Sequence, residues 1–394
     1  MATTYRLATQ IEERLQQRNH AVEAFFEREA ATLALACREM AERFLEGGRL
    51  LAFGRGPYAT DAQHVSVEFV HPVIVGKRAL PALDLSSLFR PWVEAILQPK
   101  DIVMGFGPPD GDPEVWATLQ QARARDAMTF ALPGSDGSYA VEPPAQDPFI
   151  HQEIIEILYH TLWETVHVFF EHRELGHNVG ESAFLYPFLG QEKQETDDLV
   201  SEVAVSILAK AREDSKLRSA VAGKEAEQIS TVALAIHERL LRGGKLILFG
   251  NGGSATDAND LAIDCVLPPP GYRPIPAVSL SLEPANITAV ANDVGADVIF
   301  LRQLLAQARP QDVALGISTS GGSRNIISAL AGARKLGLLT VALLGYDGGE
   351  IFRQGLADCS IVVHCDYIPR IQEVQASIYH ILRDILEVLG RGHA

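Results

Sequence analysis

The sequence predicts an α/β fold in which a parallel sheet is covered by helices on both faces, and it predicts this fold twice. Short apolar runs alternate with amphipathic helical segments, a pattern typical of parallel sheets buried on both faces. The segment that begins at Ala41 also recurs at His237, at an offset of 237 − 41 = 196 residues. Because a repeat at a fixed offset marks a repeated structural unit, we expect two domains of one kind.

The expected strands are clearest in the second copy. In chain order they cover residues 245–250, 273–281, 312–318, 338–345 and 359–365. Each copy opens with a long helical stretch, which in the second copy runs over Thr196–Leu241 and is a natural packing partner for another copy. Each copy ends in a helical segment that contains Gln-Glu and then Tyr-His, at 151–160 and 371–380.

The two copies differ in length. Their closing helices are offset by 372 − 152 = 220 residues, so the second copy carries 220 − 196 = 24 additional residues before its last helix. The Pro and Gly of "LYPFLGQEK" are typical of a linker. We therefore expect one domain over residues 1–190 and another over 191–394, with the boundary near Gly190.

The composition is that of a globular protein. The chain has 394 residues, of which 47% are hydrophobic and 21% charged. Its 34 basic and 50 acidic residues give a formal charge of −16, which argues against a nucleic-acid or anionic-membrane surface. The charged N-terminus predicts no secretory signal, and no apolar run reaches membrane-spanning length. Four cysteines without a Cys-x-x-Cys pair predict free thiols in a reducing cytoplasm.

A loop suited to phosphate follows the third expected strand of the second copy. The stretch "STSGGSRN", Ser318–Asn325, lies between the apolar "DVALGI" and the helical "IISALAGARKLG". Hydroxyls and backbone N–H groups can converge there on an anion, and the dipole of the following helix adds a favourable potential. Alone, the stretch also fits an ordinary polar turn. A second glycine-rich turn, "GNGGSATDA", follows the first expected strand.

Four stretches together resemble a known family. "GNGGSATDA", "ANDVGADVIFLRQ", "GISTSGGS" and "RIQEVQASIYHIL" have the order and spacing of the phosphoheptose isomerases, which residues 191–394 resemble along essentially their whole length. These SIS-type (sugar isomerase) proteins convert sedoheptulose 7-phosphate into an aldoheptose 7-phosphate. The resemblance implies flavodoxin-like SIS domains, a tetramer, and active sites at subunit interfaces. It implies the substrate-binding residues Asn251, Gly252, Gly253, Ser254, Asn292, Asp293, Ser318, Thr319, Ser320, Ser323 and Gln372.

The resemblance also implies a metal site in the first copy. Family members bind a divalent metal, usually zinc, through a His and a Glu on the helix after the first glycine loop and a Gln and a His on the last helix. The first copy has all four, as His64, Glu68, Gln152 and His160. A His and a Glu at i, i+4 face the same way on a helix, as two ligands of one ion require, although a surface pair fits the same spacing.

The second copy departs from the family at two of these positions. It has Asp260 and Asp264 in place of the His and the Glu, followed by Gln372 and His380. Asp264 is one methylene shorter than the Glu that the family uses as its catalytic base. A shift of about 1 Å in such a group can cost on the order of a hundredfold in rate. The second copy thus combines a phosphate loop with an altered catalytic centre.

The first copy shows the opposite pattern. There "GFGPPDGDPEV" replaces "GISTSGGSRNI", which places Pro108 and Pro109 where the family has Thr and Ser. Prolines offer no N–H group to an anion, and Asp110 and Asp112 would repel a phosphate. The first copy also lacks a counterpart of the adjacent Asn292 and Asp293 of the second copy. We expect a degenerate SIS domain that has lost its phosphate loop and kept the metal-type residues.

The complementary losses predict that the two copies supply different parts of one site. The second would hold the phosphate. The first would contribute Glu68 as base and His160 to move a proton at oxygen, with a metal ion polarising the carbonyl. The reaction would convert sedoheptulose 7-phosphate into D-glycero-D-manno-heptose 7-phosphate, or a related heptose, through an enediol. In an alternative, the second copy works alone, with Asp264 as base and His380 as its partner.

Two further alternatives stay open: a non-catalytic sugar-phosphate sensor or assembly protein, and an isomerase for another sugar phosphate. We expect no nucleic-acid or membrane partner, a cytoplasmic location, and a homodimer that forms a pseudo-tetramer of SIS domains. Three histidines outside the motifs predict a solvated helical face and its tail: His167, His172 and His177.

Overall fold

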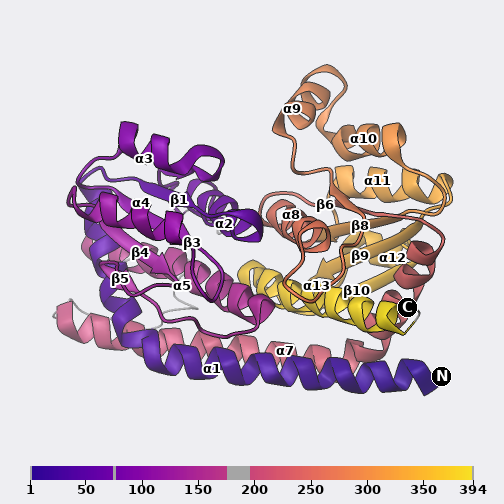
Figure 1. Ribbon diagram of the computed structural model, residues 1–394, viewed down its shortest axis with the longest axis horizontal. Coiled ribbons are helices and arrows are strands. Elements are labelled where there is room, and N and C mark those ends of the chain that lie inside the picture. The colour runs from indigo at the N-terminus through magenta and orange to yellow at the C-terminus, as the bar shows by residue number, and fades with distance from the viewer. Residues whose placement is uncertain (1, 74–76, 175–195, 393–394) are drawn as a thin grey trace. The chain divides into compact units, whose positions relative to one another are not determined.

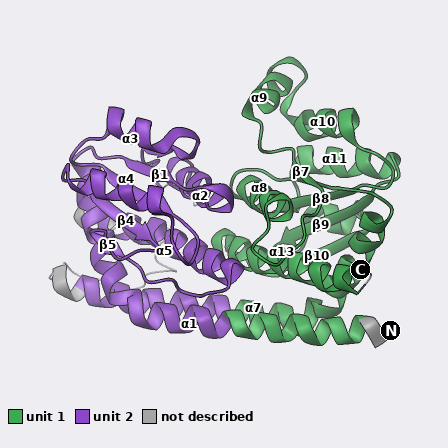
Figure 2. Cartoon of the chain, viewed as in Figure 1, with its two compact units in different colours: residues 1–18, 216–394 green, residues 19–215 purple. Residues whose placement is uncertain are grey.

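The computed structural model describes residues 2–73, 77–174 and 196–392 (Figure 1). The chain divides into two compact units (Figure 2). Unit 1 comprises residues 1–18 and 216–394, and unit 2 comprises residues 19–215. The predicted boundary near Gly190 lies outside the described residues, so the expected division at 190 stays a prediction.

Unit 2 contains a five-stranded parallel sheet with the order β2-β1-β3-β4-β5. Its strands are β1 (Leu50–Phe53), β2 (Ala82–Asp84), β3 (Ile102–Phe106), β4 (Met128–Leu132) and β5 (Tyr139–Ala140). The helices of this half of the chain are α1 (Ala2–Leu45), η1 (Gly56–Tyr58), α2 (Ala59–Val70), η2 (Ser86–Leu88), α3 (Phe89–Ile96), α4 (Pro113–Arg123) and α5 (Pro148–Glu174). Every residue of β1, β3 and β4 is buried, as expected for strands covered on both faces.

Unit 1 contains a second five-stranded parallel sheet, with the order β10-β9-β8-β6-β7. Its strands are β6 (Leu246–Phe249), β7 (Ala277–Ser279), β8 (Val313–Ser318), β9 (Leu339–Gly345) and β10 (Cys359–Val363). The helices of this half are α7 (Thr196–Leu241), α8 (Gly253–Val266), α9 (Pro284–Asp293), η4 (Ala296–Val298), α10 (Ile299–Gln307), α11 (Arg324–Lys335), α12 (Gly349–Arg353) and α13 (Ile368–Arg391). Numbered within each half, both sheets have the flavodoxin-like order 2-1-3-4-5. The predicted fold class is confirmed.

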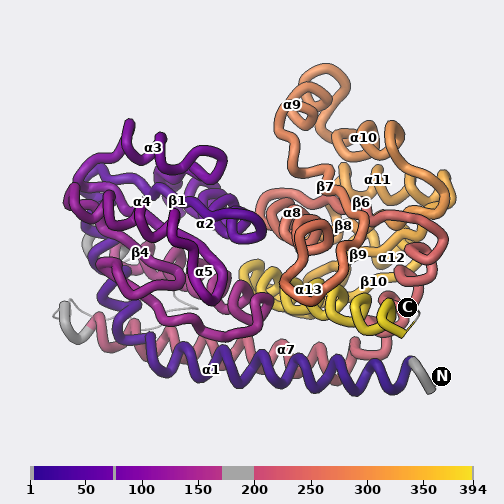
Figure 3. Tube along the Cα trace, in the orientation of Figure 1, coloured from indigo at the N-terminus to yellow at the C-terminus, as the bar shows by residue number. Residues whose placement is uncertain are grey.

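Strand pairing fixes which positions of the two units are equivalent. Leu50 pairs with Ile102 in unit 2, and Leu246 pairs with Val313 in unit 1. The offset is therefore 246 − 50 = 196 at the first strand and 313 − 102 = 211 at the third. At the last strand it is 359 − 139 = 220. The 24 additional residues thus fall in two places: 15 (211 − 196) in the segment that contains α9, which Figure 3 traces in orange, and 9 (220 − 211) in the segment that contains α12.

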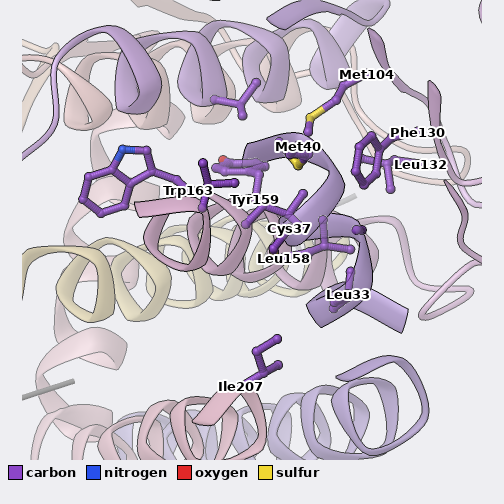
Figure 4. Close-up of a cluster of buried hydrophobic side chains, with 14 of the residues drawn as sticks. Leu33, Cys37, Met40, Met104, Phe130, Leu132, Leu158, Tyr159, Trp163 and Ile207 are labelled. Carbon is purple, nitrogen blue, oxygen red and sulfur yellow. The ribbon is translucent and has the colours of Figure 1, made fainter. Parts of the chain in front are cut away.

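The two long helices α1 and α7 each contribute to both cores. Apolar residues near the start of α1 belong to the core of unit 1: Leu7, Ala8, Ile11 and Leu15. Apolar residues near the start of α7 belong to the core of unit 2: Leu199, Val203, Ile207 and Ala211. Figure 4 shows Ile207 in the same cluster as Leu33, Leu158 and Trp163. The helical spacing of these residues predicts a buried stripe, but not which sheet it covers.

An ion pair with a buried carboxylate ties the start of α1 to α13 and the start of α7 to α5. In unit 1, Arg14 Nη1 lies 2.7 Å from Asp384 Oδ2. In unit 2, Lys210 pairs with Glu164, and both side chains are almost fully buried. The positions are equivalent, since 210 − 14 = 196 and 384 − 164 = 220. Because a buried charge is tolerated only with a partner, the pairs fix the register of each helix start in its core.

Candidate functional site

In unit 1, the loops after β6 and β8 lie side by side at the carboxyl edge of the sheet. Strand β6 pairs with β7 on one side and β8 on the other, so the chain reverses its direction of winding there (Figure 1). Ligands of open α/β sheets bind at such a point. Two reciprocal amide hydrogen bonds, of 3.0 and 2.9 Å, join Asn251 of the first loop to Asn325 of the second.

The Ser/Thr/Gly loop after β8 is held in one conformation by its own hydrogen bonds. Ser318 Oγ accepts from the N–H of Gly321 at 3.1 Å, and Ser320 Oγ accepts from that of Gly322 at 3.3 Å. Gly321 has a φ of +60°, and a Cβ there would lie 2.1 Å from the Gly348 carbonyl oxygen. Only glycine fits such a position. Ser323 begins α11 without a side-chain capping bond, so its hydroxyl is not committed to the helix end.

The other predicted substrate-binding residues lie on three further helices. Gly252 precedes α8 with a φ of +57°, and Gly253 and Ser254 open that helix. Asn292 and Asp293 are exposed at the end of α9, where Asn292 donates to the Asp293 carboxylate at 2.8 Å. Thr319 lies in the loop after β8, and Gln372 is buried on α13. Among the described contacts, Asn251 and Asn325 join the loop after β6 to the loop after β8. No described contact joins Asn292 or Asp293 to either loop.

The equivalent edge of unit 2 is filled by the protein's own carboxylates. Asp112, at the position of Ser323 (323 − 211 = 112), caps α4 by accepting from the N–H groups of Glu114 and Val115 at 2.8 and 3.1 Å. Arg55 donates to Glu114 at 2.9 Å. An anion at a helix N-terminus satisfies its free N–H groups and its dipole. Asp112 already provides that anion, so this helix end has no comparable use for a phosphate.

Unit 2 brings a His, a Glu and a second His together in its interior. His64 and Glu68 lie on α2, and His160 lies on α5. His64 Nε2 is 3.8 Å from Glu68 Oε1 and 3.4 Å from His160 Nε2. All three side chains are buried. Burial, together with the neighbouring His160, lowers the pKa of His64 well below its usual value, which favours the neutral imidazole that a metal requires.

The spacing of the two imidazole nitrogens suits a shared metal ion. Tetrahedral zinc with Zn–N distances of about 2.0–2.1 Å places two ligand nitrogens roughly 3.4 Å apart. The Nε2 atoms of His64 and His160 are separated by 3.4 Å. These two atoms and a Glu68 carboxylate oxygen all lie within 4.8 Å of one another. The donor set and its geometry therefore suit a divalent metal.

Gln152, the fourth predicted ligand, lies eight residues before His160 on α5, which is about 12 Å along the helix axis. Its side-chain nitrogen donates to Asp61 Oδ2 at 3.2 Å and Thr60 Oγ1 at 3.3 Å. Both partners belong to the first turn of α2, whereas Glu68 lies near the end of that helix. A role for Gln152 as ligand stays a prediction.

The equivalent cluster of unit 1 is Asp260, Asp264 and His380. His380 Nε2 lies 3.3 Å from Asp260 Oδ2 and 3.2 Å from Asp264 Oδ2. The Tyr379 hydroxyl donates to Asp260 at 2.9 Å. Burial, followed by the charge of Asp260, raises the pKa of Asp264 to about 7. A carboxyl group with this pKa can accept or release a proton near neutral pH, and the His380 ring lies beside it.

One charged residue at this cluster was missed from the sequence. Arg383 is completely buried on α13, and its Nε donates to the backbone carbonyl of Asp264 at 3.3 Å. It follows His380 by three residues, so helical spacing places both on one side of α13. The equivalent residue of unit 2 is Trp163 (383 − 220 = 163), which is also buried.

The prediction of a solvated face at His167 was wrong. His167 is 3% exposed, and its ring nitrogens lie 2.9 and 3.0 Å from the carbonyl oxygens of Trp163 and Arg78. Helix α5 is apolar on more than one side, so a histidine there is buried with local acceptors. The side chain of His172 and the whole of His177 lie outside the described residues.

Across the described ranges, no helix combines the length and the apolar character needed to cross a bilayer.

Known proteins resemble the chain at two levels. The family model described as SIS domain matches residues 211–345. The phosphoheptose isomerase of Chlorobaculum parvum is 42% identical over 188 residues, covering 46% of this chain and 88% of that protein. That of Sulfurimonas denitrificans is 45% identical over 170 residues, covering 42% and 84%. The chain belongs to the phosphoheptose isomerase family. This membership confirms the resemblance seen in the sequence and the prediction of an isomerase.

A likeness in fold extends over nearly the whole chain. The C-terminal domain of glucosamine-fructose-6-phosphate aminotransferase from Francisella tularensis matches with a TM-score of 0.64. The match covers 95% of this chain and 94% of that one at 8% sequence identity. At this identity the likeness concerns the fold alone, and it supports two domains of this fold in one chain.

Proposed function

We propose that the protein is a sugar-phosphate isomerase that converts sedoheptulose 7-phosphate into D-glycero-D-manno-heptose 7-phosphate, or a related heptose, through an enediol. The observation that carries the proposal is the loop after β8. It places Ser318, Ser320 and Ser323 around the start of α11, beside the Asn251–Asn325 pair at the switch point of the sheet. Hydroxyl and N–H donors before a helix are suited to a phosphate group.

The two units carry different parts of the reaction in this proposal. Unit 1 binds the phosphate through the loop after β8, which includes Thr319, and the loop after β6, which includes Gly252. Unit 2 supplies the proton transfers, because its Glu68 is buried beside His64 and His160. The Glu68 carboxylate removes the proton from the carbon beside the carbonyl and returns it to the neighbouring carbon. His160 would move a proton to and from the oxygen through Nδ1, since its Nε2 faces His64, so that no high-energy charge persists on the enediol.

His64, Glu68 and His160 would hold the divalent metal, which we propose is zinc. When bound, such an ion polarises a carbonyl and stabilises negative charge that develops on its oxygen. The burial of the three side chains excludes water from the proton transfers and keeps each group in a fixed direction.

A second assignment of the base is supported by one observation. The pKa of Asp264, raised to about 7 by burial and Asp260, leaves this carboxyl able to accept a proton at neutral pH, and His380 lies 3.2 Å away. Asp264 and His380 would then act within unit 1 as base and proton carrier. We favour Glu68, because its neighbours also fit a metal and because its side chain has the length of the family's base.

We also propose that two chains associate, since each chain carries two SIS domains and a homodimer would contain four. Light scattering during gel filtration would give a mass near 86 kDa, twice the 42.9 kDa of one chain. A mass of 42.9 kDa would contradict this part of the proposal.

The experiment that tests the function follows turnover of sedoheptulose 7-phosphate by the purified protein. We expect Ser320→Ala to weaken binding and turnover at least tenfold. Pro109→Ala, at the equivalent position of unit 2 (320 − 211 = 109), is the matched control and should change neither. Binding of the sugar phosphate without turnover would instead favour a non-catalytic sensor. Turnover only of another sugar phosphate would correct the substrate.

A further inference from the structure

The equivalent clusters of the two units are built from different residues. In unit 2, Glu68 lies beside the two imidazoles, and a carboxylate oxygen of Glu156 also lies within 4.8 Å of a ring nitrogen of His64. Unit 1 has two carboxylates, Asp260 and Asp264, beside one imidazole, His380. All these side chains are buried. Buried carboxylates are costly unless a positive charge lies nearby, so the Asp260–Asp264 pair beside a single imidazole needs a cation.

Unit 1 contains a built-in cation at this point. Arg383 is completely buried, and its Nε donates to the Asp264 carbonyl at 3.3 Å. Its Nη2 donates to the Arg273 carbonyl at 2.5 Å, and its guanidinium carbon lies 5.1 Å from the centre of the Tyr272 ring. These contacts hold the guanidinium beside the backbone carbonyl of Asp264. Its charge and the His380 side chain oppose the effects of burial and Asp260 on the pKa of Asp264.

The ion pair with Glu387 does not fully neutralise the charge of Arg383. Arg383 Nη1 lies 3.4 Å from Glu387 Oε2. The same carboxylate is shared with Arg273, at 3.4 Å, and with Arg391, at 3.0 Å. Three guanidinium groups thus share one carboxylate, which leaves positive charge to balance the two aspartates. Only Arg383 of the three is buried, so its field is the least screened by water.

Unit 2 has a different residue at this position. Trp163 replaces Arg383, and an indole carries no charge. His167 replaces Glu387 (387 − 220 = 167), one turn farther from His160, with its ring nitrogens on two backbone carbonyls. Where unit 1 has a guanidinium three residues past its histidine, unit 2 has an aromatic ring.

We propose that Arg383 takes the place of a divalent cation at the Asp260–Asp264–His380 cluster. Unit 1 then holds no metal, and each chain binds one ion, at His64, Glu68 and His160. The inference rests on the proposed metal site of unit 2 for the contrast between the units, but its statement about unit 1 can be tested separately. It makes Arg383 a positioning residue that excludes metal from one of two equivalent sites.

The first test counts zinc in the full chain by mass spectrometry after loading and dialysis. We expect about one zinc per chain in the wild type, none in His64→Ala and one in Asp264→Asn. Two zinc ions per chain, one of them lost in Asp264→Asn, would overturn the inference and leave the proposed function standing. A single zinc that His64→Ala retains and Asp264→Asn loses would overturn both. No zinc in the wild type would overturn the metal assignment of unit 2, and the second test would then decide the inference.

The second test removes the guanidinium. Arg383→Leu should gain one zinc per chain, and the double variant with Asp264→Asn should lose it again. Arg391→Leu removes an exposed guanidinium that shares Glu387 and should gain none. A gain of metal is not a result that simple loss of structure produces. A folded Arg383→Leu protein that gains no zinc would overturn the inference. Were that variant unfolded, the zinc count of Asp264→Asn against the wild type would still decide.

Discussion

Arg55 donates a hydrogen bond of 2.9 Å to Glu114 at the two positions where unit 1 joins Asn251 to Asn325 through paired amides. The same two loops are thus tied together in both units. Neutral amides that can turn toward a ligand are replaced in unit 2 by an ion pair on the protein itself. Because of this exchange and the capping role of Asp112, carboxylates of the protein occupy this edge of unit 2, and it has no need of a bound phosphate.

The first prediction concerns that cap. Asp112→Ala should lower the free energy of unfolding by about 1 kcal/mol, because the N–H groups of Glu114 and Val115 lose their acceptor. Affinity for sedoheptulose 7-phosphate should not change. Urea unfolding and titration calorimetry measure the two effects. Asp110→Ala removes an exposed aspartate of the same loop and is the control for charge. A large change in sugar-phosphate affinity in Asp112→Ala would show that unit 2 does bind the phosphate.

The phosphate loop yields the second prediction. Gly321→Ala should reduce affinity for the sugar phosphate at least tenfold, since a Cβ there would approach the Gly348 carbonyl oxygen to 2.1 Å at a φ of +60°. Calorimetric titration checks it. Gly223 lies in the middle of α7, where an added Cβ would meet nothing within 4 Å. Gly223→Ala should therefore bind normally and gain up to about 1 kcal/mol of stability. Unchanged affinity in Gly321→Ala would mean that the phosphate is held elsewhere.

The third prediction is a dependence of stability on pH. The pKa of Asp264 rises from 3.8 to about 7 on folding, chiefly through burial. Between these values the folded protein keeps a proton that the unfolded chain has released, so the free energy of unfolding should fall as pH rises through this window. Asp264→Asn should flatten that slope in urea unfolding measured across it. Asp297→Asn, which removes an exposed carboxylate, should leave it as it is. An equal slope in wild type and Asp264→Asn would contradict the assignment.

A fourth prediction separates buried from exposed ion pairs on α7. Lys210→Met should cost about 3–5 kcal/mol, because Glu164 is left buried without its partner. Arg212→Met breaks an exposed pair with Glu27 and should cost at most about 1 kcal/mol. Chemical unfolding of both variants gives the comparison. Similar losses in the two would mean that the start of α7 is not anchored through Lys210.

Local and repeated features could be predicted from the sequence. The five strands of the second copy and helix Thr196–Leu241 lie where apolar runs and helical periodicity placed them. The 24 additional residues appear in the strand registers. The i, i+4 spacing of His64 and Glu68 predicted a shared direction, and the structure places His160 beside them. These features depend on spacing along one segment, or on comparison of a segment with its own repeat.

Features that depend on distant contacts could not be predicted. The first turns of α1 pack into unit 1, whose other residues begin only at Lys216. The sequence could not predict this packing, because the apolar stripe that contains Ile11 does not specify its partner. Arg383 reads as an ordinary surface arginine on a helix until Asp264 and Arg273 are seen beside it. His167 was misplaced for the same reason, since its two acceptor carbonyls come from different parts of unit 2.

The central claim is that unit 1 holds the phosphate and Glu68 of unit 2 transfers the proton. Initial rates of sedoheptulose 7-phosphate isomerisation in Glu68→Gln and Asp264→Asn test it most directly. We expect Glu68→Gln to lower kcat at least about 100-fold, because the variant loses the general base. The kcat of Asp264→Asn should stay within about tenfold of the wild-type value, because Asp264 is not the general base in this proposal. Loss of turnover in Asp264→Asn, with Glu68→Gln still active, would contradict the claim and assign the base to unit 1.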